Sequence, residues 1–200
     1  MAVTSDRGAP MHDGAASEPQ LFMRLPELGD LPPAPPLDAS YALRTATQAD
    51  HGQLAELLSE AFADKWDAKR VAVEFSPDNG VEATYVVVSP AGVVATASAR
   101  RLPDRYPEAG YVHYVGVRVS ERGRRLGELV TGRVLVHFVA VGLDQAVLET
   151  DDFRLPAVRT YLRLGFVPEP RTPGEARRWS KVLRNLALTG EGAAKVPGSP

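Results

Sequence analysis

The feature that most constrains the fold is a strand-like run that passes through a glycine- and arginine-rich turn directly into an apolar helix. One face of the run Tyr111–Val119 carries every second residue. These residues are Tyr111, His113, Val115, Val117 and Val119. Residues 120–125 form the turn, and apolar positions from Leu126 to Val141 follow at helical spacing. A strand joined to a helix in this way predicts an α/β fold.

The remaining segments continue the alternation of strands and helices. We expect strands at 40–45, 81–89, 93–101 and 146–150, and one that starts at Phe166. We expect helices after Thr47, around 67–75, from Pro156 and over 174–186. The turn Pro90-Ala91-Gly92 favours an antiparallel hairpin between two of these strands. Together the segments predict a mixed sheet flanked by helices.

Proline content suggests how the 200 residues are divided. Residues 1–40 hold seven of the 17 prolines, and we expect a disordered and proline-rich N-terminal arm there. Its second half has enough leucine and phenylalanine to lie on the domain as an extended segment, and a flexible linker is the alternative. We expect one domain over 41–188 and a disordered tail over 189–200.

Composition excludes several classes of protein. The chain has no cysteine, which excludes disulfides, thiol catalysis and cysteine-bound metals, and its four histidines show no ligand spacing, so no metal is expected. The net charge of −2 argues against general nucleic-acid binding. We find no apolar stretch of membrane-spanning length and no secretory signal, and therefore expect no membrane association and a cytoplasmic location. Nothing indicates an oligomeric state.

The turn after the long strand is a candidate anion site. A helix N-terminus leaves several backbone N–H groups unpaired and carries partial positive charge, so it can hold a phosphate or pyrophosphate. Gly123 and Gly127 let a ligand approach the backbone, and Arg122, Arg124 and Arg125 add positive charge. An exposed, solvated loop is the alternative interpretation. The turn is neither a Walker loop nor the dinucleotide GxGxxG pattern.

Two motifs at this spacing resemble the GNAT superfamily of acyl-CoA-dependent N-acetyltransferases. The first is Val115-Gly116-Val117 with the turn 122–127, and the second is Ala157-x-x-x-Tyr161-x-x-x-Gly165-Phe166. The resemblance covers roughly residues 41–170. It implies a single α/β domain whose mixed sheet is mostly antiparallel. The helical period of residues 174–186 predicts a C-terminal helix, which departs from the β-hairpin that ends many members.

The resemblance also implies a binding site for acetyl-CoA as co-substrate. Backbone amides of the turn would bind the CoA pyrophosphate, at Arg122, Gly123, Arg124, Arg125, Leu126 and Gly127. Backbone groups of Val115 and Val117 would bind the pantetheine arm. The family usually has Gly where this chain has Arg125, and often Asn where it has Arg154. We expect Arg154 to reach the phosphates instead.

Tyr161 is the candidate catalytic acid. The family often places a tyrosine here to protonate the departing CoA thiolate, and a phenol can do so. The alternative is a half-buried helix residue that packs on the sheet.

Candidates for the general base are less specific. The strand before the turn holds no carboxylate, but it carries His113, whose imidazole ordinarily titrates near neutral pH. A hydrogen-bonded structural histidine is the alternative. Glu149, Asp151, Asp152 and water are rival bases, and either aspartate could instead cap the next helix.

The sequence therefore predicts an N-acetyltransferase that moves an acetyl group from acetyl-CoA to a primary amine of a small molecule or a peptide. Without cysteine, the amine would attack directly in a ternary complex. The alternative is a CoA-binding module of the same fold that acts as a sensor or interaction domain without catalysis. A nucleic-acid-associated module is a third and weaker interpretation.

Overall fold

The computed structural model describes residues 18–188, which form a seven-stranded sheet and five α-helices. Residues 1–17 of the expected N-terminal arm and the expected tail over 189–200 lie outside the described residues. The strands are β1 (Leu21–Leu25), β2 (Ala42–Thr45), β3 (Val81–Ser89), β4 (Gly92–Arg101), β5 (Ala109–Val117), β6 (Gln145–Thr150) and β7 (Val167–Pro168). The helices are α1 (His51–Phe62), α2 (Ala68–Glu74), α3 (Leu126–Ala140), α4 (Leu155–Arg163) and α5 (Pro173–Leu188).

The sheet has the order β2-β3-β4-β5-β6-β1-β7. Neighbouring strands are antiparallel except β5 and β6, which run parallel and are connected through α3. The predicted α/β class and the mixed, mostly antiparallel sheet are therefore confirmed, and so is the C-terminal helix.

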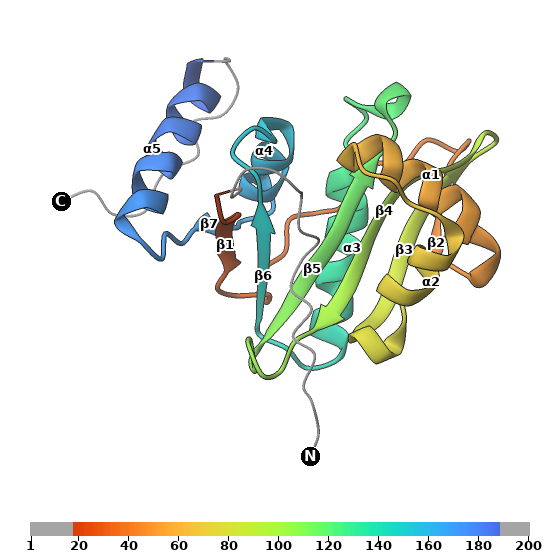
Figure 1. Ribbon diagram of the computed structural model, residues 1–200, viewed down its shortest axis with the longest axis horizontal. Helices are drawn as coiled ribbons and strands as arrows, with labels where there is room; N and C mark the ends of the chain where they lie inside the picture. Colours follow the sequence, from red (N-terminus) through yellow and green to blue (C-terminus); the bar gives the residue numbers. More distant parts are fainter. Residues whose placement is uncertain (1–17, 189–200) are drawn as a thin grey trace.

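Helices cover both faces of the sheet (Figure 1). One face packs on α3, whose Val130, Val134 and Phe138 are fully buried. The other packs on α1 and α2 through a smaller cluster that includes Leu57 and Leu58. The core thus has two layers, and β5 lies between them.

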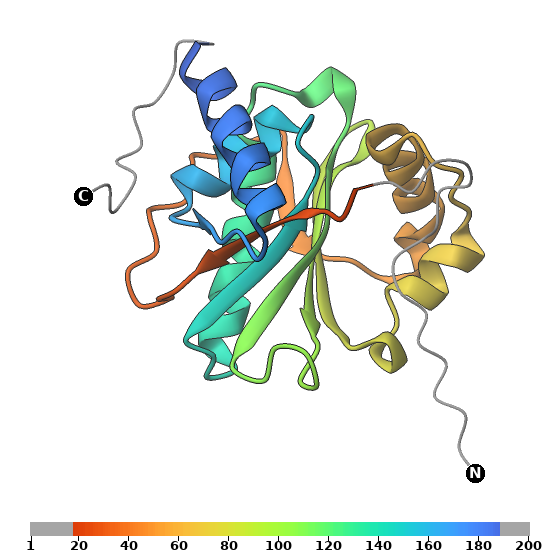
Figure 2. The same cartoon turned by 60° about the vertical axis from the view of Figure 1, so that its left-hand side comes forward.

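The N-terminal segment differs from the arm expected outside the domain. Residues 21–25 form β1, which pairs with β6 on one side and with β7 on the other. Figure 2 shows this red strand beside the teal strand β6. Leu21, Phe22 and Met23 are at most 1% exposed. The apolar residues of the arm are therefore part of the sheet and not a layer on its surface.

A bulge in β5 changes which residues share a face. Ser98 of β4 pairs with His113 and Thr96 pairs with Gly116, so Ala97 lies opposite two residues of β5. Tyr114, in the bulge, has a φ of 45°. An extra residue reverses the alternation beyond it.

The prediction that His113 shares a face with Val115 and Val117 is consequently wrong. Val115 and Val117 pack on the α3 side, whereas His113 contacts Tyr114 and Phe75 on the side of α1 and α2.

Candidate active site

The parallel strands β5 and β6 pair only at their beginnings. The register runs from Ala109 opposite Gln145 to Tyr111 opposite Val147, although the strands continue to Val117 and Thr150. Beyond this point the two strands diverge toward their C-terminal ends (Figure 1). We call the divergent part the β5–β6 fork. Within residues 18–188, the facing edges of the fork have no ladder partner, so their backbone groups are available to a ligand.

The turn before α3 has two residues in the left-handed backbone region. Gly123 has a φ of 83° and Arg125 one of 57°, both in the left-handed region. Arg125 is the N-cap of α3, and the first helical hydrogen bond runs from the Leu129 N–H to the Arg125 carbonyl. The N–H groups of the first turn therefore have no acceptor within the helix. Residues 122–125 are exposed.

Two of the three arginines in this turn are bound to carboxylates. Arg124 pairs with Glu121 at 3.0 Å. Arg125 pairs with Glu128, which also accepts a hydrogen bond from Arg163 of α4 at 3.0 Å. Burial of Glu128 opposes its ionisation, but its bonds with the two arginines outweigh burial and hold the pKa of this carboxyl below its ordinary value. The cluster offsets a negative charge at the end of α3 where an anion would bind.

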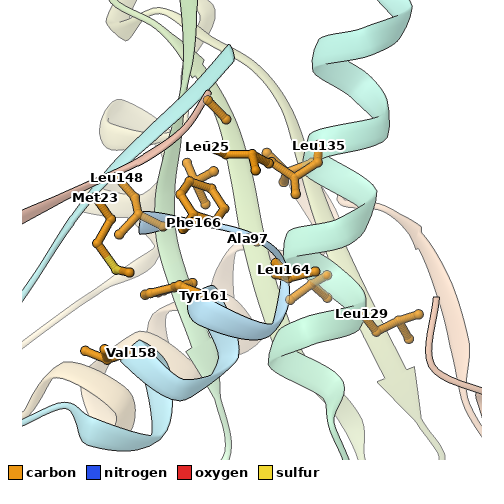
Figure 3. Close-up of a cluster of buried hydrophobic side chains, with 14 of the residues drawn as sticks. Met23, Leu25, Ala97, Leu129, Leu135, Leu148, Val158, Tyr161, Leu164 and Phe166 are labelled. Carbon is orange, nitrogen blue, oxygen red and sulfur yellow. The ribbon is translucent and has the colours of Figure 1, made fainter. Parts of the chain in front are cut away.

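Tyr161 lies on α4 among buried apolar side chains (Figure 3). It is 6% exposed, and Met23, Leu148, Val158 and Phe166 surround it in the figure. Burial raises the pKa of the Tyr161 phenol to about 12, while the charge of Arg154 acts to lower it and that of Asp151 to raise it. The phenol is therefore protonated at neutral pH.

Arg154 does not bind at the α3 turn. Its Nε donates to Asp151 at 2.8 Å and its Nη1 donates to the Ala61 carbonyl of α1 at 3.1 Å. Its guanidinium carbon lies 4.7 Å from the centre of the Phe62 ring. The side chain thus joins the end of β6 to the end of α1.

His113 is buried beside the bulge and is 9% exposed. Its Nε2 lies 3.5 Å from Nη1 of Arg100, and its Nδ1 has no hydrogen-bond partner among the described residues. Burial, assisted by the charge of Arg100, lowers the pKa of His113 to about 3. The imidazole is therefore neutral at physiological pH and a weak base.

The three carboxylates proposed as alternatives to His113 for the general base all accept hydrogen bonds from neighbouring side chains. Glu149 accepts hydrogen bonds from Arg105 and Tyr111, and Arg178 binds Asp152. Asp151 accepts from Arg154 and, at 3.1 Å, from the Gln20 amide.

Gln20, which precedes β1, is not among the residues that the sequence singles out, because nothing local links it to residue 151. Only the unexpected position of β1 brings the two residues together.

Between residues 18 and 188 no three metal-ligating side chains come together. Over the same range, no helix combines the length and apolar character needed to span a bilayer.

Comparison with known proteins finds acetyltransferases similar to this chain. The family model described as "Acetyltransferase (GNAT) family" matches residues 52–166, which include β5, the α3 turn and α4. Curated relatives named mycothiol acetyltransferase are 31% identical over 160 residues in Actinosynnema mirum and 34% identical over 149 residues in Thermobispora bispora. These alignments cover 76% and 67% of this chain, but 53% and 49% of the relatives. The chain thus spans about half the length of the curated relatives it matches.

Solved structures share the fold. A GCN5-related N-acetyltransferase from Kribbella flavida superposes with a TM-score of 0.55 at 24% identity, covering 76% of this chain and 55% of that one. The Salmonella typhimurium protein yncA, solved with its cofactor acetyl-CoA, superposes with a TM-score of 0.56 at 18% identity, covering 64% and 80%.

Proposed function

This chain belongs to the acetyltransferase (GNAT) family, and we propose that it transfers an acetyl group from acetyl-CoA to a primary amine by direct attack in a ternary complex. One observation carries the proposal furthest. The β5–β6 fork lies beside the α3 turn, so a strand edge without a ladder partner and a helix N-terminus are next to each other. An elongated ligand with an anionic end would match that arrangement.

The α3 turn fits the pyrophosphate of CoA. Its backbone amides from Arg122 to Gly127 would bind the phosphate oxygens. A Cβ added at Gly123 would meet no atom within 4 Å, so the turn has open space around it. Backbone groups of Val115 and Val117, on the facing edge of β5, would hold the pantetheine arm. Acetyl-CoA supplies an activated thioester, and the chain supplies its orientation.

Tyr161 would act as the acid. Its phenol remains protonated well above neutral pH, so a proton is available for the sulfur as the C–S bond breaks. Its ring is fixed by surrounding apolar side chains, which limits the motion of the hydroxyl.

The acceptor amine would lose its proton without help from His113. An imidazole with a pKa near 3 removes a proton from an ammonium group very poorly. Glu149, Asp151 and Asp152 are each bound to arginine. We therefore propose that the amine binds in its neutral form and that water accepts the proton released during attack.

The relatives suggest the first acceptor to test. They are named mycothiol acetyltransferases, so an acceptor related to mycothiol comes first, with peptide N-termini and lysine side chains as a comparison set.

The experiment measures release of free CoA from acetyl-CoA by the purified chain across these amines. Acetylated product and stoichiometric CoA would support the proposal. Tight CoA binding without turnover on any amine would instead favour the non-catalytic module.

A further inference from the structure

A cavity of about 310 Å³ lies at the end of β4, and no step proposed above uses it. Its walls come from three segments, which are the turn before β3, the last residues of β4 and the loop between β4 and β5. Three of the lining residues are arginines, namely Arg100, Arg101 and Arg105. The volume is at the lower end of the range for small-molecule sites.

Arg100 is held by uncharged partners. Its Nε donates to the Asn79 carbonyl at 2.8 Å, and its Nη2 donates to the side-chain oxygen of Asn79 at 2.7 Å. Its Nη1 lies 3.5 Å from Nε2 of His113, which is neutral at physiological pH. Within residues 18–188, no carboxylate therefore compensates the charge of this guanidinium.

Arg101 is in the same situation. Its Nη1 donates to the Ala109 carbonyl at 3.2 Å and its Nη2 to the Pro107 carbonyl at 3.1 Å. Arg100 and Arg101 are half-buried, whereas Asp78 and Asp104, which also line the cavity, are exposed. Water and salt screen exposed charges more than partly buried ones. The inner wall of the cavity is therefore positive and can form charge-assisted hydrogen bonds to an anion.

The turn before β3 holds the wall rigidly. The Arg101 N–H donates to the Gly80 carbonyl at 2.7 Å. Gly80 has a φ of 76°, and a Cβ there would collide with the carbonyl oxygen of Arg101. This close contact fixes Asn79 beside Arg100. A guanidinium that is already fixed loses little conformational freedom when it binds a ligand.

The cavity adjoins the beginning of the β5–β6 fork. Nη2 of Arg105 donates to Glu149 of β6 at 2.7 Å, and Glu149 also accepts from Tyr111 at 3.1 Å. Tyr111 is the last residue of β5 in the ladder with β6, so the fork starts there. Arg100 contacts His113, two residues further along β5. The cavity thus lies on the face of the sheet that α1 and α2 cover.

The proposed position of acetyl-CoA points its acetyl end toward this cavity. The pyrophosphate would bind at the α3 turn, and the pantetheine arm would pass Val117 and then Val115. Continued in that direction, the ligand approaches the beginning of β5, where the cavity lies. An acceptor whose amine meets the acetyl group can therefore place another group in the cavity.

We propose that the cavity binds the carboxylate of the acceptor, and that Arg100 and Arg101 select amines that carry a carboxylate a few bonds away. Amino acids and short peptides with a free C-terminus have this chemistry. The inference rests on the proposed function and names the class of its acceptor. The carboxylate only binds, and the amine attacks the thioester as described above.

The test compares glycine peptides of two to four residues, each as the free acid and as the C-terminal amide. The two forms differ in charge only at the C-terminus. We expect kcat/KM to be about tenfold or more higher for the acid at one of these lengths, because a guanidinium binds a carboxylate better than an amide. Arg100→Gln should reduce this preference to about threefold or less and leave kcat/KM for the amide within about twofold of the parent.

Two further variants separate binding from folding. Arg101→Gln removes the second guanidinium and should also reduce the preference for the acid. Arg133→Gln is the matched control, because it removes the same charge from α3, where Arg133 lies over the Tyr85 ring on the opposite face of the sheet. It should leave the preference within about twofold of the parent. A purely structural role of Arg100 and Arg101 would lower kcat/KM equally for acid and amide, and that result would overturn the inference.

A binding measurement keeps this inference distinct from the proposed function. N-acetylglycylglycine and its C-terminal amide resemble products and cannot react, so calorimetry on the CoA-saturated chain gives their Kd values without turnover. A tighter Kd for the acid that is lost in Arg100→Gln would support the carboxylate site even if the chain acetylated no amine, a result that would overturn the proposed function.

An active chain without preference for the acid at any length would overturn the inference and leave acetyl transfer standing. Inorganic phosphate is the second probe for the same cavity. Binding of phosphate without any difference between the two peptides would show an adventitious anion site only, and would also overturn the inference.

Discussion

Tyr161 is the residue on which the chemistry depends most directly. We expect Tyr161→Phe to lower kcat about ten- to a thousandfold, because the sulfur loses its proton donor while the ring keeps its packing. Calorimetric titration with CoA should give a Kd within about twofold of the parent, since the turn amides are untouched. Unchanged turnover would remove Tyr161 from the mechanism.

The buried His113 predicts how the free energy of unfolding depends on pH. Its folded pKa of about 3 lies below its ordinary 6.5, so between these values the unfolded chain binds a proton that the folded chain does not. Its contribution to stability is therefore present above pH 6.5 and is lost as the pH falls, by about 2 kcal/mol at pH 5. In His113→Gln, the difference in unfolding free energy between pH 7.5 and pH 5 should be smaller by about that amount in urea titrations.

The same variant tests the absence of a histidine base. Since we propose that the amine binds in its neutral form, kcat/KM should rise with pH up to the pKa of the acceptor. His113→Gln should show the same rising limb of the pH profile. A limb that disappears in His113→Gln would identify His113 as the base after all.

At the scale of elements, the α3 turn carries the main departure from its family. Arg125 occupies a left-handed conformation that costs a non-glycine residue about 1 kcal/mol. It also neutralises Glu128, which is 3% exposed at the N-terminus of α3. The arginine therefore compensates for a buried carboxylate that would otherwise repel phosphate.

We accordingly expect Arg125→Gly to weaken CoA binding although glycine suits the backbone. With only Arg163 left beside Glu128, the loss should be about 1 kcal/mol, roughly fivefold in Kd by calorimetry. The double variant Arg125→Gly with Glu128→Gln should recover the parent affinity. A tighter Kd in the single variant would show that backbone strain outweighs charge.

The elements themselves follow from periodicity and turn chemistry. The hairpin of β3 and β4, the turn before α3 and the helix at Pro156 all lie where local patterns predict them. The bulge at Tyr114 is not predictable, because one extra residue leaves the alternation of valine and tyrosine unchanged on either side. That single insertion moves His113 to the opposite face from the one its spacing predicts.

For the whole molecule, β1 sets the minimal folding unit. A chain that begins at residue 41 lacks Leu21, Phe22 and Met23, each of which contributes about 2 kcal/mol through burial. The sum of these three contributions approaches the whole free energy of unfolding of an ordinary domain. We expect the shortened chain that begins at residue 41 to aggregate or to lose cooperative thermal unfolding, measured by circular dichroism. A chain that begins at residue 18 should unfold cooperatively.

A peptide of residues 18–40 provides the control, because it should restore cooperative unfolding to the shortened chain when added in excess. A shortened chain that is monomeric and as stable as the parent would contradict the integral role of β1. Sequence patterns predict that the domain begins after residue 40, whereas β1 lies before that point. The pairing of β1 with β6 joins segments that are far apart in the sequence, so no local pattern reveals it.

The place of β1 in the sheet also governs how the protein is made. The strand leaves the ribosome early, but its partners β6 and β7 are synthesised only after most of the domain. At about 5–20 residues per second, this apolar segment waits on the order of ten seconds for them. During that time its leucine, phenylalanine and methionine side chains lack the strands that bury them in the folded sheet. Completion of the sheet, and with it the contact between Gln20 and Asp151 at the candidate site, is therefore a late event in the synthesis of the chain.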